Sequence, residues 1–388
     1  MKYFYRLIAI LVNLILFIGC TSNIPNNTFD LNKVISIEKP KVNYDLKKLP
    51  KNINIFLFDA EGNQEKEFIN GFSVNYYFFK KELNYSPKVN FITKKELDKR
   101  ECSLTLKNSD YSIIFLTDYF LNNLKPSCLN RILKLKAIII NASNYLKVNN
   151  QSQIVLDLDK NKEFKNLLKF AKNNGSINTY FIDEEDTLDN DVLSKLWLSL
   201  NGKVLGFSTS NGKLNQNLLS NVLLIESSKE RSRKLSRALS SSLESNPRRR
   251  MDLDSIIMSV SLAEARRLKP ELEYNFGESL SVYLLPNWDD ESFYFEKEFD
   301  LENVSLIDLP WMFNPKIPYL GDLTKKRNRN FAFGYDSYDL TILLNNPSSL
   351  RQFHFIGMSG ELIYSNGKLS RKSLKTEINN GLFKVIGY

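Results

Sequence analysis

NPRRRMDLDSIIMSVSLAEARRLKPELEYNFGESLSVYLLP, at residues 246–286, is the stretch that decides the fold of this 388-residue chain. Its apolar run Ser255–Val260 is short, partly β-branched and flanked by charge, which indicates a strand buried on both faces. Apolar residues then recur at spacings of three and four, as in a helix that packs one side against a sheet. That side comprises Leu262, Ala265, Leu268, Leu272 and Phe276.

The other side of this predicted helix carries Glu264, Arg267 and Glu271, which we expect to face water. Gly277 is expected to end the helix, and Leu280–Pro286 is expected to form a second buried strand. A strand, a helix and a strand in this order and of this length form the βαβ unit of a parallel sheet.

The rest of the chain repeats this alternation, which predicts an α/β fold with doubly wound sheets. The turn residues Asn366 and Gly367 predict a tight hairpin near the end. Residues 151–157 are expected to cross from a first lobe to a second. Expected strands lie at 53–58, 89–92, 111–116, 137–141, 177–182 and 204–209, and expected helices at 66–83, 162–173 and 191–200.

Several blocks of the sequence resemble the LppC family of outer-membrane lipoproteins. The first is PRRRMDLDSIIMSVSLAEARRLKPELEYNFGESLSVY, and the family's first helix is matched more loosely by INGFSVNYYF at 69–78. The others are LIDLPWM at 306–312, FAFGYDSYDL at 331–340 and IGMSGELIYSNGKLSRKSL at 356–374.

The resemblance implies a type I periplasmic-binding-protein-like fold at residues 51–388, with two doubly wound lobes and hinge crossovers. Lobe 1 is expected at about 51–150 and 300–388, and lobe 2 at about 151–299. Residues 221–228 have the local pattern of a strand, whereas the resemblance implies a helix there. We follow the resemblance, because so short an apolar run cannot be typed by its periodicity.

Members of the LppC family activate penicillin-binding proteins, so the resemblance implies a regulator and not an enzyme. Its expected partner is a class A penicillin-binding protein, whose transpeptidase step in peptidoglycan synthesis it would stimulate. The match covers the family's C-terminal domain and lacks its N-terminal helical-repeat domain. An alternative is a solute-binding or sensing lipoprotein that closes on a small molecule such as an amino acid.

The N-terminus has the pattern of a bacterial lipoprotein signal peptide at residues 1–19. Lys2 and Arg6 precede a short apolar run, and FIGC at 17–20 predicts cleavage before Cys20 and lipidation of that residue, although Phe17 stands where Leu is usual. A plain membrane anchor is the alternative. Thr21 in place of Asp favours the periplasmic face of the outer membrane by resemblance to the lipoprotein sorting rule.

Residues 20–50 are rich in Asn, Lys and Pro and are expected to form a flexible tether of at most about 100 Å. The two remaining cysteines, Cys102 and Cys128, form either a disulfide or two buried thiols. A single histidine, His354, cannot supply a zinc site.

The formal charge of +9 is spread among nearly as many acids, and no nucleic-acid-binding signature occurs. A basic surface also suits a chain beside anionic lipid or peptidoglycan. No nucleophile elbow, phosphate loop or metal-ligand cluster is present, so we expect no catalytic residue, cofactor or metal, and a cell-wall hydrolase is disfavoured. The acidic run at 183–191 fits a solvated helix start better than a calcium loop.

Two sets of residues are candidates for contact with a ligand or partner. Arg248, Arg249 and Arg250 could dock a carboxylate-bearing surface or pair with nearby acids. Trp311 could be an exposed binding residue or part of the packing between lobes. Strand-end loops at the cleft between the lobes would contribute Asn141, Ser143, Tyr335 and Asp336.

Overall fold

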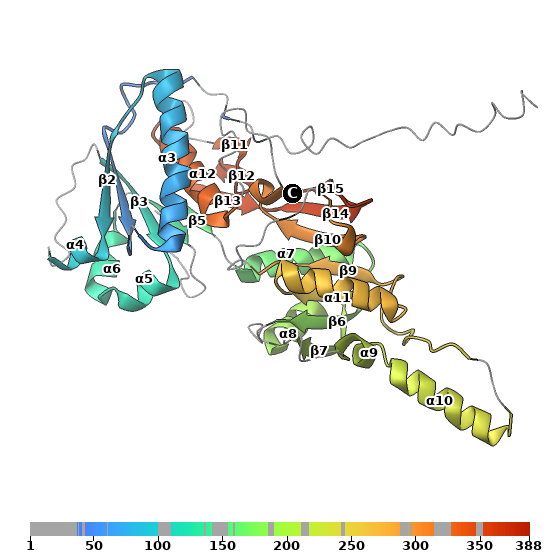
Figure 1. Ribbon diagram of the computed structural model, residues 1–388. Coiled ribbons are helices and arrows are strands. Elements are labelled where there is room, and N and C mark those ends of the chain that lie inside the picture. Colours follow the sequence, from blue (N-terminus) through green and yellow to red (C-terminus); the bar gives the residue numbers. More distant parts are fainter. Residues whose placement is uncertain are drawn as a thin grey trace, which may run out of the picture.

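The computed structural model consists of two α/β lobes, each built on its own sheet (Figure 1). Among the described residues, no helix is long and apolar enough to cross a membrane. The structure describes residues 37, 39–40, 43–59, 61–99, 110–135, 137–141, 154–157, 160–184, 190–210, 217–241, 245–287, 294, 297–313, 327–346 and 352–388.

Lobe 1 contains a five-stranded, fully parallel sheet in the order β2-β1-β3-β4-β5. Side chains alternate between its faces: Ile53 and Ile55 of β1 pack toward α3 and α12, while Phe56 packs toward α5 and α6. The elements are β1 (Asn52–Leu57), α3 (Asn63–Leu83), β2 (Lys88–Thr93), α4 (Lys94–Lys99), β3 (Asp110–Leu116), α5 (Asp118–Asn123), α6 (Pro126–Ile132), β4 (Ala137–Asn141), β5 (Ile154–Asp157) and α12 (Arg329–Asn345).

Lobe 2 contains a seven-stranded sheet in the order β15-β14-β10-β9-β8-β6-β7, in which β14 and β15 run antiparallel to their neighbours. Helices α7 and α8 cover one face, and α9 and α11 cover the other. The elements are α7 (Lys160–Asn173), β6 (Asn178–Asp183), α8 (Asn190–Ser199), β7 (Lys203–Thr209), α9 (Leu218–Val222), β8 (Ser255–Ser259), α11 (Leu262–Tyr274), β9 (Ser281–Leu284), β10 (Val304–Asp308), β14 (Leu374–Asn379) and β15 (Leu382–Gly387).

The remaining elements lie beside these sheets. Helix α10 (Ile225–Ala238) extends away from lobe 2, and a small antiparallel sheet lies beside lobe 1 (Figure 1). Its strands are β11 (Gln352–Ile356), β12 (Glu361–Ser365) and β13 (Lys368–Lys372), and the 3₁₀ turns are η2 (Phe299–Leu301) and η3 (Pro310–Phe313). The chain crosses between lobes three times, after β5, after β10 and after β13.

The βαβ unit predicted from residues 246–286 is confirmed, because β8 and β9 pair in parallel on either side of α11. The predicted hairpin is also present, with Asn366 and Gly367 both at positive φ. Residues 221–228 lie in α9 and α10, so the helix implied by the family resemblance is correct and the strand suggested by local pattern is wrong.

Two details of the predicted helix differ. Glu264 is buried, because its carboxylate accepts hydrogen bonds from Ser210 and Arg267. Phe276 is exposed, because α11 ends at Tyr274 and Phe276 adopts a positive φ of 65°. Gly277 then donates its N–H to the carbonyl of Leu272 at 2.8 Å and closes the helix end.

The lobe boundaries expected from the sequence need correction. Strand β5 pairs with β4 and therefore completes the sheet of lobe 1 before the chain crosses. Strands β10, β14 and β15 belong to the sheet of lobe 2, although residues 300–388 were expected in lobe 1. The apolar pattern of β10 indicates burial on both faces but does not specify which parallel neighbour it joins, and that neighbour is β9.

The predicted tether also ends earlier than residue 50, because its last part packs on lobe 1. The Lys39 ammonium donates to Asp339 Oδ1 at 2.9 Å and to Asn75 Oδ1 at 2.5 Å. The Tyr44 ring meets the Phe79 ring edge-on at 5.7 Å between centroids, and Leu49 is buried. Burial lowers the pKa of Lys39 and raises that of Asp339, while each charge opposes the shift of the other.

Two glycines let α3 and α12 cross with their backbones in contact. A Cβ atom on Gly334 would lie 1.9 Å from the carbonyl oxygen of Phe68, and one on Gly71 would lie 1.9 Å from that of Phe331. Nearly every residue of α12 is buried, so this crossing sets the position of the helix that forms the core of lobe 1.

Replacing Gly334 with alanine should therefore destabilise the protein. The added methyl group meets backbone that cannot move alone, and the overpacking should cost about 3 kcal/mol even though alanine favours helices. Denaturant unfolding measures this change, with Asn70→Ala on the exposed side of α3 as the control. A Gly334→Ala protein as stable as wild type would contradict the close crossing.

Candidate functional site

Two buried ion pairs lie where the chain crosses between the lobes. At the end of β10, Asp308 is completely buried and forms a bidentate pair with Arg329 at the start of α12, with N–O distances of 2.9 and 2.6 Å. Tyr294 Oη and the Leu309 N–H also donate to this carboxylate, at 2.9 and 2.7 Å. The carboxylate is thus fully hydrogen-bonded within the junction.

A second buried pair lies at the other two crossings. Arg371, near the end of β13, donates to Glu163 Oε1 of α7 at 2.6 Å. The same guanidinium donates to the carbonyls of Asp157 and Ser359 at 3.1 and 3.0 Å and to Ser373 Oγ at 2.7 Å. One side chain therefore connects the end of β5, the start of α7, the β11–β12 turn and the start of β14.

These two pairs fix the angle between the lobes. Arg329 and Asp308 form two parallel hydrogen bonds, whereas Arg371 and Glu163 form one, and both members of each pair are shielded from water. Opening or closing the lobes would have to move a buried charge away from its partner, which costs several kcal/mol. We call the Asp308–Arg329 and Glu163–Arg371 pairs the clamp, because separating either pair opposes a change in the angle between the lobes.

The residues predicted for the inter-lobe cleft do not converge on a ligand site. Asn141 ends β4 and donates its amide to Asp157 on the neighbouring strand at 3.2 Å. Tyr335 and Asp336 lie in the middle of α12, not in a turn, and both are buried. Ser143 lies outside the described residues, so its role stays a prediction.

Asp336 instead holds the turn between β11 and β12. Its carboxylate accepts from the N–H groups of Met358 and Ser359 at 2.9 and 2.7 Å and from Ser359 Oγ at 2.5 Å. Burial raises the pKa of Asp336 to about 7, although the hydrogen bonds from Ser359 and Met358 act in the opposite direction. A Cβ atom on Gly357 would lie 2.4 Å from this carboxylate, so the turn fits closely around it.

The three arginines before β8 have separate surroundings. Arg250 forms a bidentate pair with Asp252 at 2.8 and 2.7 Å, as one of the two sequence interpretations expected. Arg249 donates to Ser279 Oγ at 2.9 Å and to carbonyls of its own loop. The side chain of Arg248 is exposed.

Trp311 is buried and packs between lobes, stacked on the Phe331 ring at 4.9 Å with Arg327 above it at 5.6 Å. Cys128 is buried and disulfide-bonded, while Cys20 and Cys102 lie outside the described residues. The pairing of Cys102 with Cys128 and the lipidation of Cys20 therefore stay predictions.

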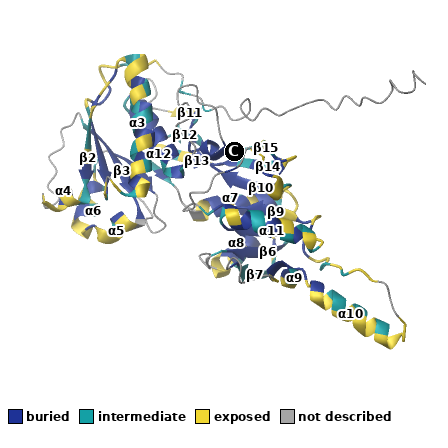
Figure 2. Ribbon diagram, in the orientation of Figure 1, coloured by how far each residue is buried: buried dark blue, intermediate teal, exposed yellow. Residues whose placement is uncertain are grey.

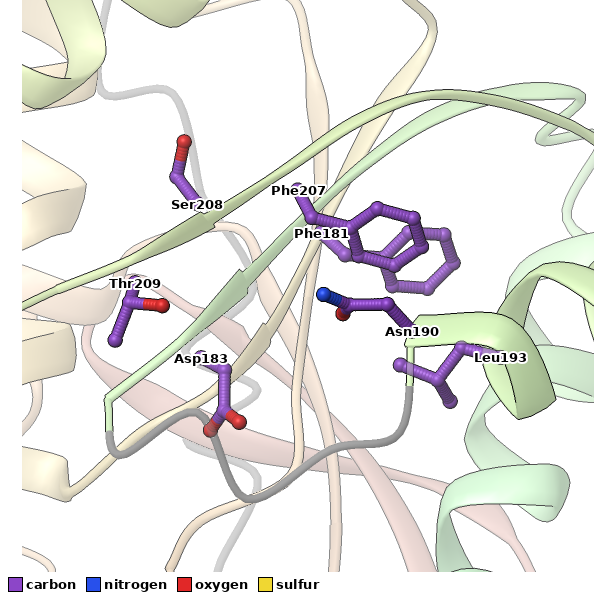
Figure 3. Close-up of a pocket in the computed structure, with 7 residues that line it drawn as sticks. All are labelled: Phe181, Asp183, Asn190, Leu193, Phe207, Ser208 and Thr209. Atoms are coloured by element: carbon purple, nitrogen blue, oxygen red, sulfur yellow. The ribbon is translucent and has the colours of Figure 1, made fainter.

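A small pocket of about 160 Å³ lies at the carboxyl ends of β6 and β7 in lobe 2 (Figure 3). This volume is below the range of about 300–1,000 Å³ that is usual for small-molecule sites. Of the acidic run at 183–191, Asp183 lines this pocket, and Glu184 caps the start of α11 by accepting from Ser261 Oγ at 2.9 Å. The pocket is lined by Phe181, Asp183, Asn190, Leu193, Phe207, Ser208 and Thr209.

In the described part of the chain, no group of three or more His, Cys, Asp or Glu side chains could hold a metal ion. His354 lies exposed on β11 and pairs with Glu361 on β12 at 3.0 Å.

The residues of the junction were not recognised from the sequence. Asp308 and Arg371 lie inside blocks that resemble the LppC family, but Glu163 and Arg329 lie outside them. Each pair joins residues that are 21 or 208 positions apart, and single-sequence patterns do not reveal such long-range partners.

Comparison with known proteins agrees with this architecture. The family model described as LppC putative lipoprotein matches residues 192–374, from α8 to the start of β14. No curated protein sequence matches the chain.

Among solved structures, the chain is similar to the C-domain of LpoA from Haemophilus influenzae, described as a regulator of PBP1A. The TM-score is 0.56 at 15% identity, with 86% of this chain and 99% of that chain covered. Full-length LpoA from the same organism gives a TM-score of 0.54 at 13% identity, with 92% and 60% covered. This chain thus spans about 60% of full-length LpoA.

A similar score links the chain to an ABC transporter protein. The structure of a putative branched-chain amino acid ABC transporter from Chromobacterium violaceum ATCC 12472 gives a TM-score of 0.53 at 15% identity, with 84% and 98% covered. Together these likenesses confirm the periplasmic-binding-protein-like fold.

The raised pKa of Asp336 predicts a pH-dependent stability. The folded state retains a proton that the unfolded state releases above the ordinary pKa of 3.8. The stabilisation is therefore complete below about pH 4 and is lost as the pH rises through about 7, a change of about 4 kcal/mol.

Asp336→Asn should remove this contribution, so that the unfolding free energy falls less between pH 4 and 7.5 than in wild type. Denaturant unfolding across this range measures it, with the exposed Asp300→Asn as the matched control. Parallel pH profiles for Asp336→Asn and wild type would contradict the prediction.

The buried pair at Arg371 predicts an asymmetric mutational cost. Arg371→Met leaves the Glu163 carboxylate buried without its guanidinium and should cost about 3–5 kcal/mol, whereas adding Glu163→Gln should recover part of the loss. Arg250→Met, which breaks a more exposed pair, should cost no more than about 1 kcal/mol. Denaturant unfolding measures the loss of unfolding free energy in each variant. Equal losses for Arg371→Met and Arg250→Met would contradict the predicted cost of breaking the buried pair.

Proposed function

We propose that this chain is a regulatory lipoprotein that binds a class A penicillin-binding protein and stimulates peptidoglycan synthesis. The observation that carries the proposal is the match of residues 192–374 to the LppC lipoprotein model. The matched stretch contains most of lobe 2, the crossing into α12 and the β12–β13 hairpin. In this proposal the protein is anchored through a lipid on Cys20 to the periplasmic face of the outer membrane.

The structural likeness supports the same partner. The C-domain of LpoA, described as a regulator of PBP1A, has this fold over 99% of its length. The shared fold does not specify a partner by itself, since a putative ABC transporter protein also has it. The family match therefore carries the proposal, and the solved structure supports it.

The clamp between the lobes favours a protein ligand over a small solute. A solute-binding protein works by closing its lobes on the ligand, and here two buried ion pairs oppose that movement. A rigid body with a fixed lobe angle instead presents one surface of constant shape. Rigid surfaces bind proteins with little loss of conformational entropy.

Activation then follows from differential binding. The regulator stimulates the enzyme only if it binds the active conformation more tightly than the resting one. Each 1.4 kcal/mol of such preference shifts the ratio of active to resting enzyme about tenfold. No bond of the substrate has to be broken or formed by this chain.

The test is a reconstitution with the class A penicillin-binding protein encoded in the same genome. The full-length, lipid-modified chain in detergent should bind the enzyme and raise its rate of peptide cross-linking on lipid II several-fold. Cross-linked muropeptides are quantified by chromatography, and a β-lactam that blocks the transpeptidase site is the control.

Absence of both binding and stimulation would overturn the proposal. Thermal stabilisation by an amino acid in that case would point to solute binding instead, because a ligand that binds only the folded state raises its stability by mass action.

A further inference from the structure

Helix α10 and the segment that follows it form an arm that stands out from lobe 2 (Figure 1). We call residues 224–241 and 245–251 the basic arm. Most of its residues are exposed, in contrast to α12, in which nearly every residue is buried (Figure 2). It lies at the end of the molecule opposite α3, which Lys39 and Tyr44 contact.

The arm is a defined structure and not a loose loop. One side of α10 carries serines at a spacing of four, and Ser228 Oγ accepts the N–H of Arg248 at 3.0 Å. Ser232 and Ser245 share a hydrogen bond, and the Arg250 N–H donates to the Leu223 carbonyl at 2.9 Å at the base. The returning segment therefore supports the helix along its serine side and leaves the other sides open.

The open sides carry a strong excess of positive charge. The described residues of the arm include two acids, Glu226 and Glu230, which pair with Lys229 and Lys234, and the sequence has one more, Glu244, between the two segments. Among the described residues, Arg231, Arg237 and Arg248 form no ion pair with an acid. The basic residues of the arm are Lys229, Arg231, Arg233, Lys234, Arg237, Arg248, Arg249 and Arg250.

Large apolar side chains are exposed on the same feature. Leu235 and Leu239 are one helical turn apart and are 53% and 57% exposed. Met251 at the root is 79% exposed, and the Arg249–Ser279 hydrogen bond places the root beside the end of α11, where Tyr274 is 85% exposed. Arg, Met, Tyr and a pair of aligned leucines are typical of protein–protein contact surfaces.

A membrane is a poor fit for this arm. A helix that lies in a lipid interface has a wide apolar face with aromatic residues, whereas α10 exposes Leu235, a row of serines and, just past its end, Leu239. Lys39, which follows the predicted lipid anchor in the sequence, binds Asp339 of lobe 1, at the other end of the molecule.

We infer that the basic arm docks on an acidic face of a partner protein, with its arginines on carboxylates and Leu235 and Leu239 in an apolar groove between them. Arginine suits this role because its guanidinium binds carboxylates in a bidentate manner and is weakly hydrated. The inference rests on the proposed function, which makes the class A penicillin-binding protein that partner.

The test compares two triple variants of the full-length protein in binding to the same penicillin-binding protein. Arg231→Glu, Arg237→Glu and Arg248→Glu reverse three charges on the arm. Lys80→Glu, Lys81→Glu and Lys88→Glu make the same net change on exposed positions of lobe 1. We expect the arm variant to bind at least about tenfold more weakly and the lobe 1 variant to bind like wild type.

A second pair of measurements separates charge from shape. Leu235→Ser with Leu239→Ser should weaken binding without changing its salt dependence, whereas the charge-reversed arm should lose most of that dependence. Circular dichroism and thermal unfolding verify that both arm variants fold. Anionic vesicles of phosphatidylglycerol serve as the probe for a lipid surface.

The outcomes distinguish this inference from the proposed function. If wild type and the arm variants bind the enzyme equally, the inference is wrong and the proposed function stands. If wild type does not bind the enzyme, both fail. Arm-dependent binding to the vesicles together with arm-independent binding to the enzyme would assign the arm to the membrane and overturn the inference.

Discussion

Two buried arginine–carboxylate pairs hold the lobes of this protein at one angle. Asp308 with Arg329 and Glu163 with Arg371 lie where the chain crosses between the two sheets. Separating either buried pair would leave a charge without its partner, which costs several kcal/mol. Trp311 stacks on Phe331 at the same junction. Because the angle between the lobes is fixed, the molecule presents a surface of constant shape, which suits recognition of another protein.

Helix α12 connects the lobe junction to the rest of lobe 1. Arg329 anchors its first turn to lobe 2, Gly334 sets its crossing with α3, and Asp336 and Asp339 hold the β11–β12 turn and the segment around Lys39. One buried helix thus connects the lobe junction, the small sheet and the N-terminal segment.

Local order could be predicted from the sequence more fully than long-range order. The strand at Ser255–Ser259 and the helix after it follow from burial and periodicity, which depend on neighbours in sequence. Placement of β10 in lobe 2 depends on its backbone partner, and the docking of Lys39 depends on Asp339, 300 positions away. Leu235 and Leu239 show why periodicity is ambiguous: their spacing is that of a buried stripe, yet both are exposed. The candidate site was predicted less well, because Asp336 and Tyr335 fill the core and the pairs at the crossings have no local signature.

The packing of Ile37, Lys39, Tyr44 and Leu49 on lobe 1 limits the length of the predicted tether. If Cys20 carries the lipid, 17 residues of chain lead from it to Ile37, which packs on the core, and they reach at most about 60 Å when fully extended. Counted to residue 50, the same leader would reach about 100 Å. A lipid on Cys20 would therefore hold lobe 1 closer to the membrane than a tether that ended at residue 50, and the basic arm lies at the opposite end of the molecule (Figure 1).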